Sequence, residues 1–214
     1  MDVTPSNAAQ QSLVGGRLCL DFINTVDEHA SDHPEEYLTS YAQLVAWCQH
    51  AQILTEAEGQ QLLAWAAPRS ADAAAALAAA IAFREALYRI FLATLADKPP
   101  PAGDLAAFNA ARFQALAHSE IAAADEGLAW RWMVGEQDPG WMLWPITRSA
   151  ADLLLSPDLQ LMKECPGPGC GWLFLDTSKN HTRRWCTMEG CGNRAKARGH
   201  YQRKRHRAHT DDLS

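Results

Sequence analysis

Four cysteines in the last quarter of the chain constrain its fold more than any other feature. Cys165 and Cys170 form one C-x4-C pair, Cys186 and Cys191 form a second, and fifteen residues separate the pairs. Two short cysteine loops with a spacer of about this length are typical of structural zinc sites. The first loop reads Pro-Gly-Pro-Gly and the second contains Gly190, and these residue types permit tight turns. We therefore predict one structural Zn²⁺ held by the four cysteines.

Two disulfides, four unrelated buried cysteines and a catalytic zinc site are the alternatives. No secretory signal opens the chain, which predicts a reducing cytoplasm and disfavours disulfides. Four thiolates fill the coordination shell of the ion, whereas a catalytic zinc keeps an open position. His181 lies between the loops, but with four cysteine ligands the site does not need it. A module this small should take much of its folding energy from the metal. We expect a chelator to melt residues from about 163 onward and to spare the larger domain.

The charge of the chain is divided unevenly. The net charge is −6, but residues 163–214 contain 11 Lys and Arg against 5 Asp and Glu, a net of +6, and residues 1–162 carry −12. Such asymmetry indicates contact with nucleic acid. Residues 193–205 read as a basic helix that leaves the second cysteine loop. We predict that the following residues contact nucleic acid: Lys179, Arg183, Arg184, Asn193, Arg194, Lys196, Arg198, Arg203, Lys204 and Arg205.

Other uses of these residues stay open. The basic segment could be a solvated tail, could bind anionic lipid or an acidic partner, or could dock on the acidic N-terminal part of the same chain. Asn193 could cap the helix instead of reaching a base. Arg194, at the helix start, is our candidate for reading base edges. Trp172 and Trp185 could stack on bases, although packing against the metal loops is the commoner use.

Several stretches resemble a known pair of domains. Cys191-Gly192-Asn193-Arg194 resembles the signature of the CGNR zinc finger family, and Trp172–Asp176 and Arg183–Cys186 agree with it. Residues 16–25, Gly-Arg-Leu-Cys-Leu-Asp-Phe-Ile-Asn-Thr, resemble the opening motif of the ABATE domain, the companion of that finger. The resemblance implies a bacterial transcription regulator induced by stress. It has an ABATE-like helical domain over 1–160, which could act as a sensor, and a DNA-binding zinc finger with a basic tail over 161–214.

The residues before the finger predict a mainly α (α+β) fold. Hydrophobic residues make up 48% of the chain, enough for a core, and no run approaches the roughly 20 apolar residues of a membrane helix. Ser40 is placed to cap one helix, and Thr55 with Glu58 forms a capping box for the next. Apolar spacing and prolines predict helices over residues 40–50, 55–65, 72–96, 104–116 and 146–155.

Short strands complete the predicted fold. Alternating apolar residues between 18 and 23 suggest a half-buried N-terminal strand or an extended entry to a helix. Residues 128–134 and 141–144 are expected to pair as a β-hairpin around a loop at 135–140, with paired tryptophans stabilising it. The tryptophans at 65, 130, 132, 141 and 144 could also wall a small-molecule pocket, although packing in the core is the commoner use. Residues 172–175 suit a short strand beside the metal loops, and a turn should follow over 176–180. The finger would then be a zinc-ribbon-like or treble-type module that ends in a basic helix.

Three polar residues in the apolar opening motif are candidates for a ligand pocket. Asp21, Asn24 and Thr25 either tie down neighbouring loops or line a cavity. With the His29 and His33 loop they could form an enzyme site, but no phosphate loop, nucleophile elbow or HExxH helix occurs. We expect a cytoplasmic DNA-binding regulator that is not an enzyme. Its partners would be double-stranded DNA, an unidentified small-molecule effector and a second copy in a homodimer. The rivals are RNA binding, protein binding through the finger, and an enzyme built on the N-terminal pocket.

Overall fold

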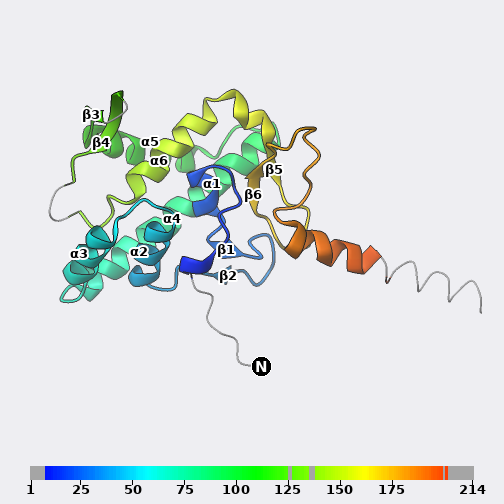
Figure 1. The fold of residues 1–214 in the computed structure, drawn as a ribbon, viewed down its shortest axis with the longest axis horizontal. Coiled ribbons are helices and arrows are strands. Elements are labelled where there is room, and N and C mark those ends of the chain that lie inside the picture. Colours follow the sequence, from blue (N-terminus) through cyan, green and yellow to red (C-terminus); the bar gives the residue numbers. More distant parts are fainter. Residues whose placement is uncertain (1–7, 125–126, 135–137, 200, 202–214) are drawn as a thin grey trace, which may run out of the picture.

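The protein is built mainly from α-helices, as its sequence predicts. The computed structural model describes residues 8–124, 127–134, 138–199 and 201. A short helix, α1, lies at the centre, with α2, α4 and α6 around it (Figure 1). The helices are α1 (Leu18–Ile23), α2 (Tyr41–His50), α3 (Glu56–Ala66), α4 (Ser70–Leu95), α5 (Ala102–Ala117) and α6 (Leu143–Leu154).

Local capping signals fix the starts of α2 and α3. Ser40 Oγ accepts a hydrogen bond from Gln43 N at 3.2 Å. Thr55 Oγ1 accepts one from Glu58 N at 3.2 Å, and the Glu58 carboxylate accepts one from Thr55 N at 2.7 Å. Both predicted caps are therefore confirmed, because each depends only on residues three apart in the sequence.

Residues 18–23 form helix α1, which corrects the predicted strand. Every apolar side chain from Cys19 to Ile23 is fully buried, so the segment lacks the polar face that would reveal a helical period. The helix starts without a cap from its own chain neighbours. Instead, Cys19 N donates to Ser149 Oγ of α6 at 3.1 Å, so a residue remote in the sequence caps it.

Three antiparallel strand pairs occur in the described residues. They are β1 (Val26–Asp27) with β2 (Glu35–Glu36), β3 (Ser119–Ala124) with β4 (Gly127–Trp132), and β5 (Met162–Glu164) with β6 (Leu173–Leu175). A β-hairpin does form from the predicted strand at 128–134, but the prediction that this strand pairs with residues 141–144 is wrong. Residues 119–124 pair with 127–132, while Trp141 and Met142 are buried and lead into α6. Strand β3 reads Ser-Glu-Ile-Ala-Ala-Ala, and alanine gives no strand signal.

Strand β6 separates two apolar cores. Leu173 and Leu175 belong to the main core, together with α1, α2, α4 and α6. Trp172 and Phe174 belong to a smaller core with the four predicted metal ligands. Successive side chains of a strand point to opposite faces, so one short strand serves both. The finger and the helical body therefore share this element across the predicted boundary at 160.

The helices have lengths and compositions suited to packing against one another. None of the helices in the described residues is long and apolar enough to span a membrane. The long helix α4 turns Phe83, Leu87 and Phe91 toward the core. The first cysteine loop lies between β5 and β6 and the second follows β6, and a C-terminal helix over residues 193–199 projects away from the body (Figure 1).

Candidate metal centre and nucleic-acid interface

The four predicted cysteines converge on one point. The Sγ atoms of Cys165, Cys170, Cys186 and Cys191 all lie within 4.8 Å of one another, and all four residues are buried. The Sγ atoms of Cys170 and Cys186 are 3.7 Å apart. Sulfurs at about 2.3 Å from a tetrahedral zinc ion are separated by about 3.8 Å. The donor atoms and their spacing therefore fit a metal ion of the size and preference of zinc, and the cluster is a metal-binding centre.

Backbone geometry places the cysteines. Cys165 N donates to Trp172 O at 2.8 Å, which extends the β5–β6 pairing up to the first ligand. Gly167 lies so close to the cluster that a Cβ there would stand 2.7 Å from Cys191 Sγ. Gly169 has φ +75°, a left-handed conformation that glycine adopts without strain. The glycines of the first loop are thus required by close approach and by backbone conformation.

The sulfurs influence one another's protonation. Hydrogen bonds from the thiols of Cys170 and Cys186 lower the pKa of Cys165. The side-chain hydrogen bonds of Cys170 with Cys165 and with Cys186 raise the pKa of Cys170. Thiols this close cannot all ionise by themselves, because each thiolate disfavours the next. A divalent cation removes this obstacle, so metal binding would release protons from the cluster.

Arg194 belongs to the metal centre. Its Nη2 donates to Cys191 Sγ at 3.1 Å, and Cys186 N donates to Cys165 Sγ at 3.4 Å. Hydrogen bonds to metal-bound sulfur orient the ligands and offset their charge. The structure therefore gives Arg194 a partner within the protein, where the sequence suggested a base edge.

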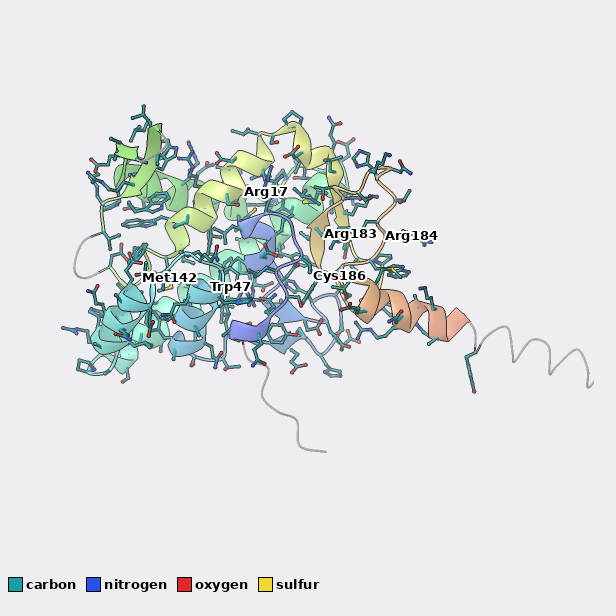
Figure 2. The ribbon with its side chains drawn as sticks, in the orientation of Figure 1. Arg17, Trp47, Met142, Arg183, Arg184 and Cys186 are labelled. Atoms are coloured by element: carbon teal, nitrogen blue, oxygen red, sulfur yellow. The ribbon has the colours of Figure 1, made fainter. Side chains whose placement is uncertain are left out.

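Arg183 is held inside the finger. Its guanidinium donates to the backbone carbonyls of Val14, Leu175, Trp185 and Cys186 at distances from 2.6 to 3.3 Å. It also lies over the Phe174 ring, 4.2 Å from the centroid. Figure 2 shows Arg183 beside β6 and Arg184 farther out from the body. Arg183 thus joins the finger to the N-terminal segment, and its donors are not directed at a partner molecule.

The remaining predicted contacts are exposed or lie outside the described residues. Lys179, Arg184, Asn193, Lys196 and Arg198 are exposed. Arg203, Lys204 and Arg205 fall outside the part of the chain that the structure describes.

Asn193 does not cap the helix that follows the fourth cysteine. Its φ of −69° and ψ of −39° place it within the helical run. The cap is Thr187, whose Oγ1 accepts a hydrogen bond from Gly190 N at 3.0 Å at the start of the helical turn Met188–Gly192. Helical winding thus begins before the cysteine, and the side chain of Asn193 is exposed at the surface.

The predicted turn after β6 is confirmed. Asp176 Oδ1 accepts a hydrogen bond from Ser178 N at 3.1 Å, and Asp176 is fully buried. Its other oxygen pairs with Lys163 Nζ, which also donates to His181 O at 2.8 Å and to Arg183 O at 3.2 Å. Lys163 of β5 thus ties down the loop between the two cysteine pairs.

Comparison with known families agrees with this arrangement. Residues 16–157 match ABATE, described as "Putative stress-induced transcription regulator". The chain belongs to the ABATE family. Residues 162–204 match the CGNR zinc finger, so both resemblances seen in the sequence are confirmed. No curated protein sequence matches the chain.

The polar residues of the ABATE opening motif are engaged within the protein. Asn24 Nδ2 donates to Leu173 O, and Asn24 Oδ1 accepts from Leu173 N, both at 2.9 Å. Asp21 Oδ1 accepts from Gly15 N at 2.7 Å, and Thr25 Oγ1 accepts from Arg84 Nη1 at 3.1 Å. Asn24 and Thr25 are fully buried, and Asp21 is 8% exposed. These polar side chains therefore hold neighbouring segments against α1, which is the alternative to lining a ligand pocket that the sequence allowed.

The ABATE loop after α1 folds over the first cysteine loop. His29 N donates to Cys170 O and Ala30 N to Gly169 O, both at 3.0 Å. The His29 ring stacks on Tyr88 with centroids 3.8 Å apart, and its Nε2 lies 2.9 Å from the Glu85 carboxylate. This loop connects the long helix α4 to the metal centre.

A shallow hollow of about 550 Å³ lies beside the finger. Arg183, Cys186 and neighbouring residues line it, including Ser178, Thr182, Arg184, Trp185, Thr187 and Met188. The Arg184 guanidinium lies 5.6 Å from the Trp185 ring centroid, and Met188 is 52% exposed. Sequence reasoning missed Thr182 and Met188, because neither is charged. Trp172 is a core residue, since it is 8% exposed and its Nε1 donates to Val26 O at 2.8 Å.

Proposed function

We propose that this protein is a DNA-binding transcription regulator whose CGNR finger is held together by structural zinc. The observation that carries the proposal is the basic helix that leaves the four-cysteine centre and projects from the body (Figure 1). The ABATE match supports the regulatory part of the proposal. Such a role belongs in the cytoplasm of a bacterial cell.

Zinc is the metal that this donor set favours. Four thiolates in a tetrahedral arrangement select zinc or an iron–sulfur centre, and a mononuclear site with these spacings suits zinc. All four positions are occupied by protein sulfur, so the ion has no open position for a substrate. We therefore assign the zinc a structural role.

The exposed charges support nucleic acid over an intramolecular partner. Lys179, Arg184, Lys196 and Arg198 make no ion pair with any acidic residue in the described ranges. Docking on the acidic N-terminal part would pair these side chains. Lys196 and Arg198 lie on the projecting helix, and Lys179 and Arg184 lie in the loop between the cysteine pairs, so the finger presents free cationic groups that can contact phosphates.

The helix offers two basic faces. Arg194 and Arg198 are four residues apart and share one face, whereas Lys196 lies on the opposite side, close to Asn193 in projection. A helix in the major groove lies between two phosphate backbones, so charge on both flanks is useful there. We propose that Arg198 contacts one backbone, that Lys196 contacts the other, and that Asn193 faces the base edges between them.

The proposal is tested by titrating zinc-loaded protein into labelled duplexes at several salt concentrations. Affinity should fall steeply as salt rises, because binding to phosphates releases counterions. Arg198→Ala and Lys196→Ala should each flatten the slope of log K against log salt by about one unit. Arg131→Ala, on the distant hairpin, is the matched control and should leave the slope unchanged. Absence of binding to random and genomic duplexes at low salt would refute the proposal.

RNA is the second candidate and is separated in the same assay. The charges that suit a duplex also suit single strands, and Trp185 with the adjacent hollow could stack a base. A single-stranded RNA competitor that displaces the duplex at lower concentration than unlabelled DNA would favour RNA. Loss of that preference in Trp185→Ala would locate the stacking.

A further inference from the structure

The helical body contains a cavity to which the finger contributes no residue. It encloses about 340 Å³ and lies between α5, α6 and the hairpin β3–β4. Sites for small molecules in proteins begin at about this volume. The polar and aromatic side chains that line it are Arg112, Ser119, Trp130, Trp132, Arg148 and Asp152.

The lining is aromatic on one side. Trp130 and Trp132 are two residues apart in β4, so their side chains lie on the same face of the hairpin. Trp132 packs against Trp144 with ring centroids 6.1 Å apart, and Trp144 stacks on His118 at 4.6 Å. The opposite wall includes Ala115 and Ala151, whose small side chains leave the space that a ring could fill.

The charged groups of the cavity have an excess of positive charge. Arg148 lies over the Trp130 ring at 3.9 Å and pairs with Asp152 at 3.4 Å. Arg112 makes no ion pair with any residue in the described part of the chain. One guanidinium at the cavity is therefore left without a carboxylate, and a single negative charge on a ligand would complete the set.

We propose that this cavity binds a small aromatic carboxylate. The ring would lie against Trp132 and beside the stacked pair of Arg148 and Trp130, and the carboxylate would meet Arg112 and Arg148. Ser119 Oγ already donates to Leu116 O at 2.9 Å, so its lone pairs are available to a ring N–H or O–H. The site is independent of the nucleic-acid proposal, because ligand binding is measured without DNA.

The cavity is also connected to the rest of the protein through α6. Ser149 of that helix caps α1 through Cys19 N, and α1 leads to Asn24 and its pair of hydrogen bonds with Leu173 of the finger. A ligand that moves α6 would thus act on elements that contact the finger. This connection gives the binding site a route to regulation, which is a question separate from binding itself.

The test is isothermal titration calorimetry of the zinc-loaded full-length protein. The probes are indole-3-acetate, phenylacetate and benzoate, each compared with its neutral amide. We expect at least one carboxylate to bind with one site per chain and its amide to bind about ten-fold more weakly, because the amide lacks the charge-assisted hydrogen bonds. Equal affinity for acid and amide, or no binding of any of the three carboxylates at millimolar concentration, would overturn the proposal.

Variants locate the site. Arg112→Gln should weaken binding about ten-fold without affecting folding, since Arg112 is exposed and unpaired within the described residues. Trp130→Ala should weaken binding by a similar factor. Arg131→Gln is the matched control, because Arg131 is the neighbouring strand residue, pairs with Glu120 and lies outside the cavity. Full binding by Arg112→Gln and Trp130→Ala would place the ligand elsewhere. A dimer in light scattering that dissociates in Trp130→Ala, with no ligand bound, would show that a second copy covers the cavity instead.

Discussion

The side chain of Asn24 pairs with the backbone of Leu173 as a neighbouring strand would. Its amide nitrogen donates to the Leu173 carbonyl and its amide oxygen accepts from the Leu173 N–H, each at 2.9 Å and fully buried. The two residues are 149 positions apart, and their contact joins the ABATE domain to the finger. A single carboxamide thus satisfies two backbone groups that have no access to water.

Replacing Asn24 by alanine should destabilise the whole protein by about 2–4 kcal/mol. Both backbone groups of Leu173 would be left buried without partners, and each such group costs roughly 1–3 kcal/mol. Urea unfolding followed by circular dichroism measures the change. Asn109→Ala, at an exposed position of α5, is the control and should change stability by less than about 0.5 kcal/mol. Equal effects of the two substitutions would contradict this role for Asn24.

Substitution by alanine should lower the stability of the protein at Arg183, but at Arg184 it should weaken only DNA binding. Arg183→Ala removes the donor to four carbonyls and should lower the free energy of unfolding by about 2–4 kcal/mol. Arg184→Ala should leave stability within about 0.5 kcal/mol of wild type and flatten the salt dependence of DNA binding by about one unit. Denaturant unfolding and binding titrations on both variants decide the matter. A stable Arg183→Ala protein would show that the carbonyl contacts contribute little.

Asp21 should make stability depend on pH. Burial raises the pKa of its carboxyl to about 6, and the hydrogen bond from Gly15 N offsets this only in part. Because an unfolded Asp titrates near pH 3.9, the folded chain holds the proton more tightly, and this contribution to stability falls as pH rises from about 4 to about 6. Asp21→Asn keeps an acceptor oxygen and removes the buried charge. The variant should therefore gain on the order of 2 kcal/mol over wild type at pH 7 and lose that advantage near pH 4.

Comparing Asp21→Asn with wild type at each pH also controls for loss of the metal. Thiolate ligands take up protons as pH falls, and this affects both proteins alike. The informative quantity is the difference in unfolding free energy between variant and wild type at each pH. A difference that stays constant from pH 4 to pH 7 would show that Asp21 does not titrate in this range.

Metal removal should weaken the helical body as well as the finger. The sequence alone suggested that a chelator would melt only residues beyond about 163. Because Leu173 and Leu175 complete the main core while their neighbours pack on the cysteines, loss of the metal should lower the melting temperature of the helical signal too. Circular dichroism at 222 nm with and without chelator measures this. An unchanged melting curve for the helical body would show that the finger unfolds independently of it.

Thiol titration of the chelated protein provides a second measurement. Four cysteines should become reactive when the metal leaves. Cys19 and Cys48 should stay slow until denaturant is added, because burial raises the pKa of Cys19 to about 12 and raises that of Cys48 as well. Six fast thiols on chelation alone would mean that the body unfolds with the finger.

The parts of the structure that the sequence predicts are those set by local chemistry. The cysteine spacing, the cap at Ser40 and the capping box at Thr55 each involve residues close in the chain, and each is found as expected. The helix at 18–23 was missed because it is buried on all sides and is capped by Ser149, 130 residues away. Strand β3 was missed because its alanines carry no strand preference.

The candidate site divides in the same way. Charge counting identifies the basic residues of the finger but cannot tell a guanidinium that faces solvent from one that faces carbonyls. Arg183 and Arg184 are adjacent in the sequence, yet the first is held by the backbone and the second is exposed. Composition alone allows Trp130 and Trp132 to wall a small-molecule pocket, but it cannot place the cavity, because its residues come from α5, the hairpin and α6, and only folding brings them together.

The two-sided strand β6 limits how this finger can be exchanged between proteins. A finger excised at residue 162 would carry Met162, Leu173 and Leu175 into water, although all three are at most 4% exposed in the whole chain. A graft onto another protein would need a host with a matching apolar recess or polar replacements at these positions. When such a finger becomes joined to a different domain, the apolar residues of this strand and those of the domain surface that it packs against should therefore change together.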